Sequence, residues 1–130
     1  MILKTNMITE DYVSYETVKL LKEKGFNENT DKQFNLDKIV GDYNITDRSR
    51  HPERYLDAPT LQMAVKWLRE REWFICVIPL AFYYGTKTWK FGYNIWAGDD
   101  LEVDEFNTPE FSTYEEACEA AIKYCLEKLI

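Results

Sequence analysis

Eight consecutive apolar residues, Trp73–Leu80, constrain the fold of this chain more than any other feature. The run is rich in branched and aromatic side chains and too short for a buried helix, which is typical of an interior strand covered on both faces. We expect the run to be an interior strand only up to Pro79, because proline has no amide to donate to a neighbouring strand. A turn follows at 84–87. The next strand alternates, with Trp89, Phe91, Tyr93 and Ile95 on one face and Lys90, Gly92, Asn94 and Trp96 on the other. We therefore predict a β-hairpin.

Three amphipathic segments flank this hairpin, and each carries the start or stop signals of a helix. The first lies between Ser14, a potential N-cap, and Gly25, which can end a helix. The second opens at 57–59 with a proline in its first turn, and the last opens with a capping box at 113–116. We expect an α+β fold, in which a three-stranded antiparallel meander over residues 73–104 is packed by about three α-helices in a single layer.

The remaining segments carry weaker signals. Residues 1–12 contain no sustained apolar period, and we expect an extended or disordered N-terminus there. Between residues 26 and 57, isolated apolar residues alternate irregularly with Asn, Asp and Lys. A structureless loop of that length is uncommon in a compact domain. We therefore expect one or two short strands, around 38–40 and 43–45, across a Gly41-Asp42 turn.

Composition and charge limit the setting of the protein. Residues 1–130 have the length of one domain, 45% of them are hydrophobic, and the formal net charge is −7. The N-terminus lacks the apolar run of a secretory signal, so we expect a cytoplasmic protein without a membrane partner. A surface of this net charge repels phosphate backbones, which makes a nucleic-acid partner unfavourable.

The histidine and cysteine content predicts neither a metal site nor a cofactor. The three cysteines, Cys76, Cys118 and Cys125, form no Cys-x-x-Cys pair and have no histidine near them in sequence. We interpret them as buried reduced thiols. His51 is the only histidine and, between charged residues and a proline, is expected on the surface.

All five arginines fall between residues 48 and 71. Forked guanidinium groups gathered on one surface would bind phosphate or carboxylate groups. The candidate ligand-binding residues are Arg48, Arg50, His51 and Arg54, which Lys66, Arg69 and Arg71 would join on the same surface. The competing interpretation is a solvated face, because acidic residues are interleaved with them.

The opposite charge dominates the C-terminal third. Between Phe91 and Ile122 there are nine acidic residues and no lysine or arginine. The spacing of the acids lacks the pattern of a calcium-binding loop, so the block predicts either edge protection and solubility or a surface that binds a partner. The candidate interface residues are Trp96, Asp99, Asp100, Glu102 and Asp104.

The helical segments resemble a group of small hypothetical proteins of gut Bacteroides-type bacteria and their phages and mobile elements. The residues that carry the resemblance are 12–17, 58–60 with Met63-Ala64 and 67–70, 113–117 and 126–130. The resemblance covers about a third of the chain. It implies a bacterial or phage origin and a cytoplasmic setting, and it implies no activity.

No phosphate-binding loop, nucleophile elbow or His-Glu-x-x-His motif occurs in the sequence. We therefore expect a non-catalytic protein-interaction module, acting as a monomer or homodimer. Two alternatives stay open: a small phosphate or anion binder or enzyme using Arg48, Arg50 and His51, and an acidic mimic of nucleic acid that occupies a basic groove of another protein.

Overall fold

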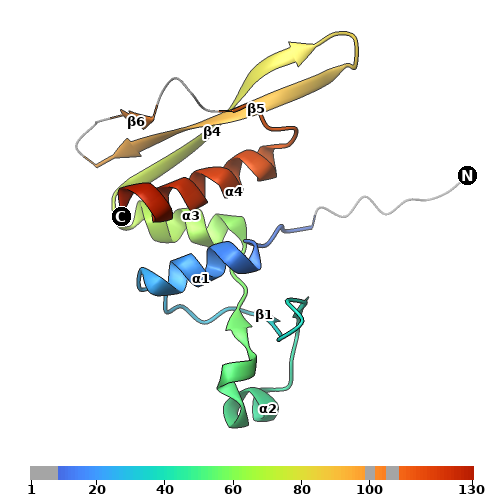
Figure 1. The fold of residues 1–130 in the computed structure, drawn as a ribbon, viewed down its shortest axis with the longest axis vertical. Coiled ribbons are helices and arrows are strands. Elements are labelled where there is room, and N and C mark those ends of the chain that lie inside the picture. Colours follow the sequence, from blue (N-terminus) through green and yellow to red (C-terminus); the bar gives the residue numbers. More distant parts are fainter. Residues whose placement is uncertain (1–8, 99–101, 105–108) are drawn as a thin grey trace, which may run out of the picture.

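Helices and antiparallel strands alternate along the chain in a computed structural model that describes residues 9–98, 102–104 and 109–130 (Figure 1). The mixed α+β class is therefore confirmed. The elements are α1 (Tyr15–Glu23), β1 (Gln33–Phe34), β2 (Val40–Gly41), α2 (Ile45–Arg50), η1 (Pro52–Arg54), β3 (Leu56–Asp57), α3 (Leu61–Arg69), β4 (Trp73–Tyr83), β5 (Thr88–Ala97), β6 (Glu102–Asp104), α4 (Tyr114–Tyr124) and η2 (Cys125–Leu129). No helix in these ranges is both long enough and apolar enough to cross a membrane.

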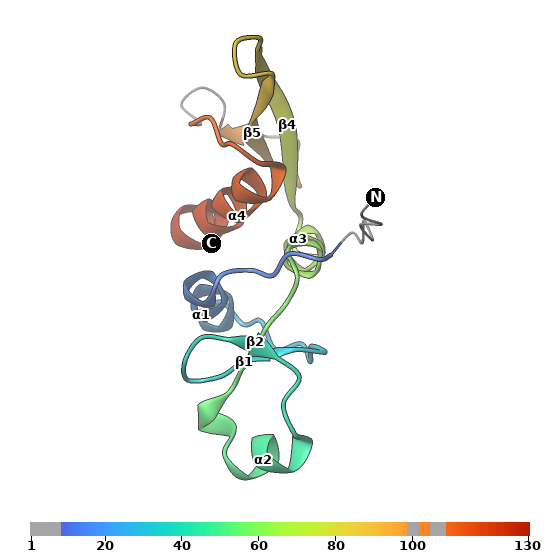
Figure 2. The ribbon, with the colours of Figure 1, turned by 90° about the vertical axis from the view of Figure 1, so that its right-hand side faces the viewer.

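The larger sheet has the strand order β4-β5-β6. Its hairpin pairs Trp73 with Ala97 and Pro79 with Phe91 in regular register, and a bulge follows between Pro79 and Ala81. α4 packs on both β4 and β5, and α3 packs on β4. Figure 2 shows α4 on one side of this sheet and open space on the other. The expectation that Trp73–Leu80 is covered on both faces is therefore wrong, because the described helices cover only one.

The core lies between that covered face and the helices. Alternation along the hairpin directs Ile95 and its cross-strand neighbour Ile75 toward α4, and Ile95 is fully buried. Small residues on α4 let the helix approach the sheet closely. The fully buried side chains of the core include Val13, Val18, Leu21, Ala64, Leu68, Ala121, Ile122, Cys125 and Leu126.

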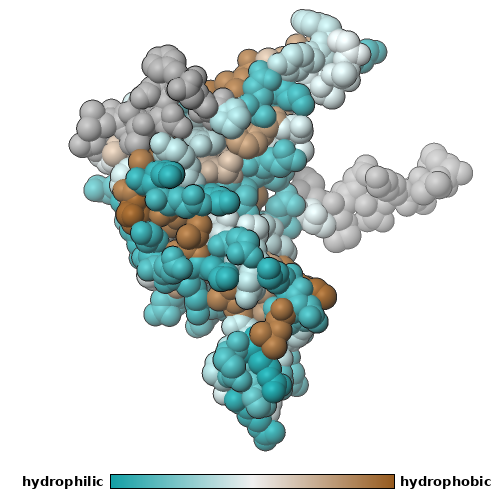
Figure 3. Space-filling view, viewed as in Figure 1, coloured by the Kyte–Doolittle hydropathy of each residue, from teal (hydrophilic) through white to brown (hydrophobic). Residues whose placement is uncertain are grey.

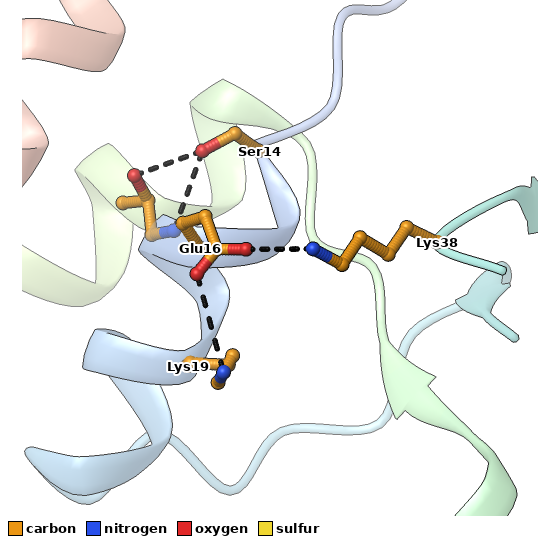
Figure 4. Close-up of polar contacts among 5 residues, drawn as sticks. Ser14, Glu16, Lys19 and Lys38 are labelled. Atoms are coloured by element: carbon orange, nitrogen blue, oxygen red, sulfur yellow. Dashed lines mark hydrogen bonds and ion pairs between the residues drawn. The ribbon is translucent and has the colours of Figure 1, made fainter. Parts of the chain in front are cut away.

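α1 begins at the predicted cap. The hydroxyl of Ser14 accepts a hydrogen bond from the backbone N–H of Thr17, at 3.3 Å. On the exposed face of the helix, a carboxylate oxygen of Glu16 lies 3.1 Å from the ammonium of Lys38 and the other lies 4.0 Å from that of Lys19 (Figure 4). The Lys38 contact ties the turn between β1 and β2 to α1.

Residues 26–57 form a second, smaller sheet with the order β2-β1-β3. Gln33 of β1 lies opposite Gly41 on one side and Asp57 on the other. The expectation of a strand around 43–45 is wrong. Asn44 instead caps α2, because its side-chain oxygen accepts hydrogen bonds from the backbone amides of Thr46 and Asp47. The strand expected around 38–40 is displaced to β2, which leaves Lys38 in the turn at a φ of 63°.

α3 and α4 also begin at caps. The Thr60 hydroxyl accepts from the amide of Met63, so α3 starts after Pro59 and not with proline in its first turn. α4 begins at the predicted cap, where the Thr113 hydroxyl accepts from the amide of Glu116 at 3.1 Å. The return bond of the capping box differs from the prediction, because the Glu116 carboxylate accepts from the amide of Ser112 instead of that of Thr113. Tyr12, within the segment expected to be extended or disordered, forms an antiparallel bridge with Thr60.

Candidate functional site

The uncovered face of the β4–β5 hairpin carries several large exposed apolar side chains. Phe74 and Trp96 are cross-strand partners on this face and are 40% and 38% exposed. Leu80 is 45% exposed, and Cys76 is also exposed. Ile78 shares the face by alternation and is half-buried. We call these five residues the outer face.

Leu80 reaches the outer face by lying across β5. A Cβ atom at Gly92 would come within 2.5 Å of a Leu80 methyl group, so the leucine occupies the space that a side chain at 92 would fill. The absence of a side chain at this position therefore allows the outer face to continue past Pro79, beside the polar side chains of Lys90 and Asn94 that alternation places on the same side of β5.

Aromatic residues cluster at the far end of the hairpin, which extends past α4 (Figure 1). The Phe82 ring lies 4.9 Å from that of Tyr84 and 5.2 Å from that of Trp89, measured between centroids. Tyr84 is 84% exposed and Trp89 52%. The neighbouring Tyr83 hydroxyl donates to Glu110 at 2.6 Å, and that hydrogen bond raises the pKa of Tyr83.

Trp96 is the one predicted interface residue whose side chain the structure describes, and it lies on the outer face. Glu102 is paired with Trp96 through the backbone, and Asp104 with Ile95. The acidic strand β6 thus borders the outer face along β5. Asp99 and Asp100 lie outside the described residues.

The predicted ligand-binding residues lie on α2 and η1, at the end of the molecule opposite the hairpin (Figure 1). Arg48 is held locally, since its Nε donates to the Tyr43 carbonyl at 3.1 Å. His51 Nδ1 lies 3.6 Å from Glu53. Neither α2 nor η1 buries a side chain, and Figure 3 shows mainly hydrophilic surface at this end. Arg50 and Arg54 are exposed there.

The basic residues of α3 and of the turn that follows it lie apart from α2 (Figure 1). The Arg71 guanidinium stacks 3.7 Å from the centroid of the Trp67 ring and donates to the Trp67 carbonyl. Lys66 and Arg69 instead line a cavity of about 470 Å³ between α3 and α4. Neither has an ion-pair partner among the described residues. The basic residues at 48–54 therefore do not form one continuous surface with Lys66, Arg69 and Arg71.

The cysteine that lines the same cavity is a poor nucleophile at neutral pH. Cys118 lines the wall beside Tyr114, and burial raises the pKa of Cys118 to about 11. Burial likewise raises the pKa of Cys125 to about 12. Both thiols are protonated and weakly nucleophilic at neutral pH. The expectation of three buried thiols is wrong for Cys76, which alternation places on the uncovered face.

Within the described ranges, no group of three or more histidine, cysteine, aspartate or glutamate side chains is placed to hold a metal ion. Comparison with protein families, curated proteins and solved structures finds no match to this chain. Among the described residues, the outer face is the most distinctive candidate surface.

Proposed function

We propose that this chain is a non-catalytic protein-interaction module that binds another protein through the outer face. The observation that carries the proposal is the group of large apolar side chains, Phe74, Leu80 and Trp96, left exposed by 38–45% on one face of a sheet. Contiguous exposed apolar surface marks interaction sites, and tryptophan is enriched among the residues that dominate binding energy. A bacterial or phage origin and a cytoplasmic setting are part of the proposal and rest on the resemblance of the helical segments.

The border of the outer face indicates the chemistry of the partner. β6 carries Glu102 and Asp104 in sequence; Glu102 is paired with Trp96 of the outer face, whereas Asp104 is paired with Ile95 of the covered face. An apolar centre with a charged rim is the usual anatomy of a protein interface, and the rim sets orientation and association rate. We therefore expect a partner with an apolar patch bordered by lysine or arginine.

A matched pair of double variants tests this proposal. Phe74→Ser with Trp96→Ser removes apolar surface from the outer face, and Leu36→Ser with Ile45→Ser removes exposed apolar surface from the opposite end. Each protein, tagged, is used to recover partners from a Bacteroides lysate, with cross-linking and mass spectrometry. We expect the wild type and the control to recover the same protein, and the outer-face variant to lose it. An unchanged set of recovered proteins would contradict the proposal.

A second candidate function, anion binding, is favoured by the cavity between α3 and α4. Two cations without ion-pair partners among the described residues, Lys66 and Arg69, line it together with apolar side chains such as Leu61 and with one carboxylate, Glu10, which leaves its charged lining positive by one. That combination suits an amphiphilic carboxylate. Calorimetric titration with decanoate tests it: Arg69→Gln is expected to abolish binding and Arg50→Gln to leave it unchanged. Equal loss in both variants, or no binding to the wild type, removes this candidate.

A further inference from the structure

We infer that two copies of this chain pair through the free edge of β4, so that their larger sheets join into one across a two-fold axis. The inference goes beyond the proposed function, because the edge of β4 and the outer face are different surfaces of the same strand. It rests on the direction of the backbone groups, the absence of edge protection and the distribution of charge.

The backbone of β4 presents, at regular spacing, hydrogen-bonding groups that no described residue pairs. Phe91 of β5 exchanges hydrogen bonds with Phe111 at 2.9 and 2.8 Å, on the side away from β4. Both backbone groups of a residue in an antiparallel ladder point the same way, and the direction alternates along the strand. Pro79, opposite Phe91, therefore points away from β5, as do Val77, Ile75 and Trp73. No strand among the described residues pairs with this edge.

The same edge has little of the protection that natural sheets use. Lysine, inward-pointing charges, proline and bulges are the common devices that prevent edge pairing. β4 has no charged residue over its whole length. Its proline and its bulge both lie at 79–81 and leave the edge from 73 to 78 open. An exposed apolar edge of this length without protection is a template for another strand.

The absence of charge on β4 allows a second copy to supply that strand. A chain with a net charge of −7 repels its own copies at long range, so two copies can meet only where the surface is neutral. The edge from 73 to 79 is such a surface, and antiparallel pairing of a strand with itself places no charge opposite another. Because an identical copy carries the same unpaired groups, the contact is self-complementary.

The register follows from the extent of the regular strand. Residues 73–79 precede the bulge, and their midpoint is Cys76. A two-fold axis at this position pairs Ile75 with Val77 of the second copy and places the two Cys76 residues opposite each other. About six backbone hydrogen bonds form, since Trp73 donates to the Pro79 carbonyl and receives none in return. The two Cys76 residues form a non-hydrogen-bonded pair, with Cα atoms about 4.5 Å apart.

Two variants of one residue test the backbone contact. Val77→Pro removes the outward N–H that the dimer uses and that β5 does not use, whereas Val77→Ala shortens the side chain and keeps the N–H. Sedimentation velocity over a concentration series gives the dissociation constant, and near-ultraviolet circular dichroism confirms the fold of each variant. We expect wild type and Val77→Ala to dimerise and Val77→Pro to dissociate at least tenfold more readily with an unchanged spectrum. If Val77→Pro unfolds, the register measurement decides the inference instead.

Oxidation of the reduced protein tests the register. Cys76 residues at this separation form a disulfide-linked dimer that Cys76→Ser lacks, because the other thiols are buried. A dissociation constant of about 1 mM is the weakest that we expect of so small an interface. A wild type that is still monomeric at this concentration overturns the inference. So does a dimer without the Cys76 link, or a folded Val77→Pro dimer of unchanged affinity. The proposed function is tested separately, since a Val77→Pro monomer that still recovers a partner keeps it, and a wild-type dimer that recovers none loses it.

Discussion

Glu119 of α4 accepts a hydrogen bond from the backbone N–H of Ser14, the N-cap of α1, at 2.5 Å. The two residues are far apart in sequence, and the bond joins the first helix to the last. The second carboxylate oxygen of Glu119 is buried and has no hydrogen-bond partner among the described residues. One oxygen of the carboxylate thus accepts a hydrogen bond from an amide, while the other oxygen is withdrawn from water.

Removal of this carboxylate is expected to destabilise the fold. Glu119→Ala should lower the free energy of unfolding by about 2 kcal/mol, because hydrogen bonds to charged groups contribute more than neutral ones. Glu119→Gln keeps an acceptor and should lose about half as much. Urea denaturation gives both values, with the exposed Lys128→Ala as the control, expected within about 0.5 kcal/mol of the wild type. Equal stability of Glu119→Ala and the control would contradict the contribution of this contact.

The three thiols should differ in reactivity. Cys76 is exposed, and burial raises the pKa of Cys118 to about 11 and that of Cys125 to about 12. A thiol reagent at pH 8 is expected to modify one cysteine rapidly in the folded protein and all three in denaturant. Cys76→Ser should lose the rapid phase. Rapid modification of two or more thiols in the folded protein would show that α4 does not bury them.

The same shifts predict weaker folding at alkaline pH. A thiol whose pKa is raised by folding stabilises the folded state fully below the unfolded value of 9.0 and loses that contribution as the pH rises toward about 11 and about 12. The midpoint of urea denaturation should therefore fall above pH 9. Cys125→Ala should show a smaller fall than the wild type over the same range, and an identical fall would assign the effect to other groups.

The pKa of Glu16 should lie below that of an ordinary glutamate. The hydrogen bond from Lys38 and the charge of Lys38 lower the pKa of Glu16 below its usual 4.5. A carboxyl with a lowered pKa stabilises the folded state above the unfolded value and loses the contribution as the pH falls through the folded one. Carboxyl NMR should show this shift in the wild type and its removal in Lys38→Ala, with Lys22→Ala as the control. A normal pKa in the wild type would mean that the ion pair does not persist in solution.

Gly92 should be sensitive to a single added methyl group. Gly92→Ala places a Cβ 2.5 Å from the Leu80 methyl, and the exposed leucine must turn away. We expect a loss of about 1 kcal/mol, the low end for overpacking. In a double-mutant cycle, Leu80→Ala should remove this loss, and Gly85→Ala, which meets no atom, serves as the control. Additive effects of the two substitutions would contradict the contact.

The parts that could be predicted from the sequence are those set by local signals. Ser14 and Thr113 cap their helices through residues three positions away, and the alternation from 89 to 96 fixes the faces of β5. The same alternation predicts that Trp96 lies on the face opposite Trp89 and is exposed, and Trp96 is 38% exposed; it does not predict that Trp89, near the end of the hairpin, is 52% exposed.

The remaining features depend on contacts between distant residues. β1, β2 and β3 are two residues long, too short for any period, and Gln33 acquires its strand conformation from partners at 41 and 57. Glu119 lies on the helix face that its charge would assign to water, and only the position of Ser14 draws it inward. The openness of the outer face could not be predicted either, because an apolar strand reads the same whether a second layer covers it or not.

α2 and η1 contribute no buried side chain. We therefore expect this part of the molecule to open locally more often than the part built on the larger sheet. Opening of residues 43–55 exposes little apolar surface, so its free energy lies far below that of global unfolding. Amide protons there should exchange with deuterium long before those of β5, and a protease should cut there first. The hydrogen bond from the Tyr55 hydroxyl to Asp47 and the contact between the Tyr43 and Tyr55 rings are among the interactions that this opening must break.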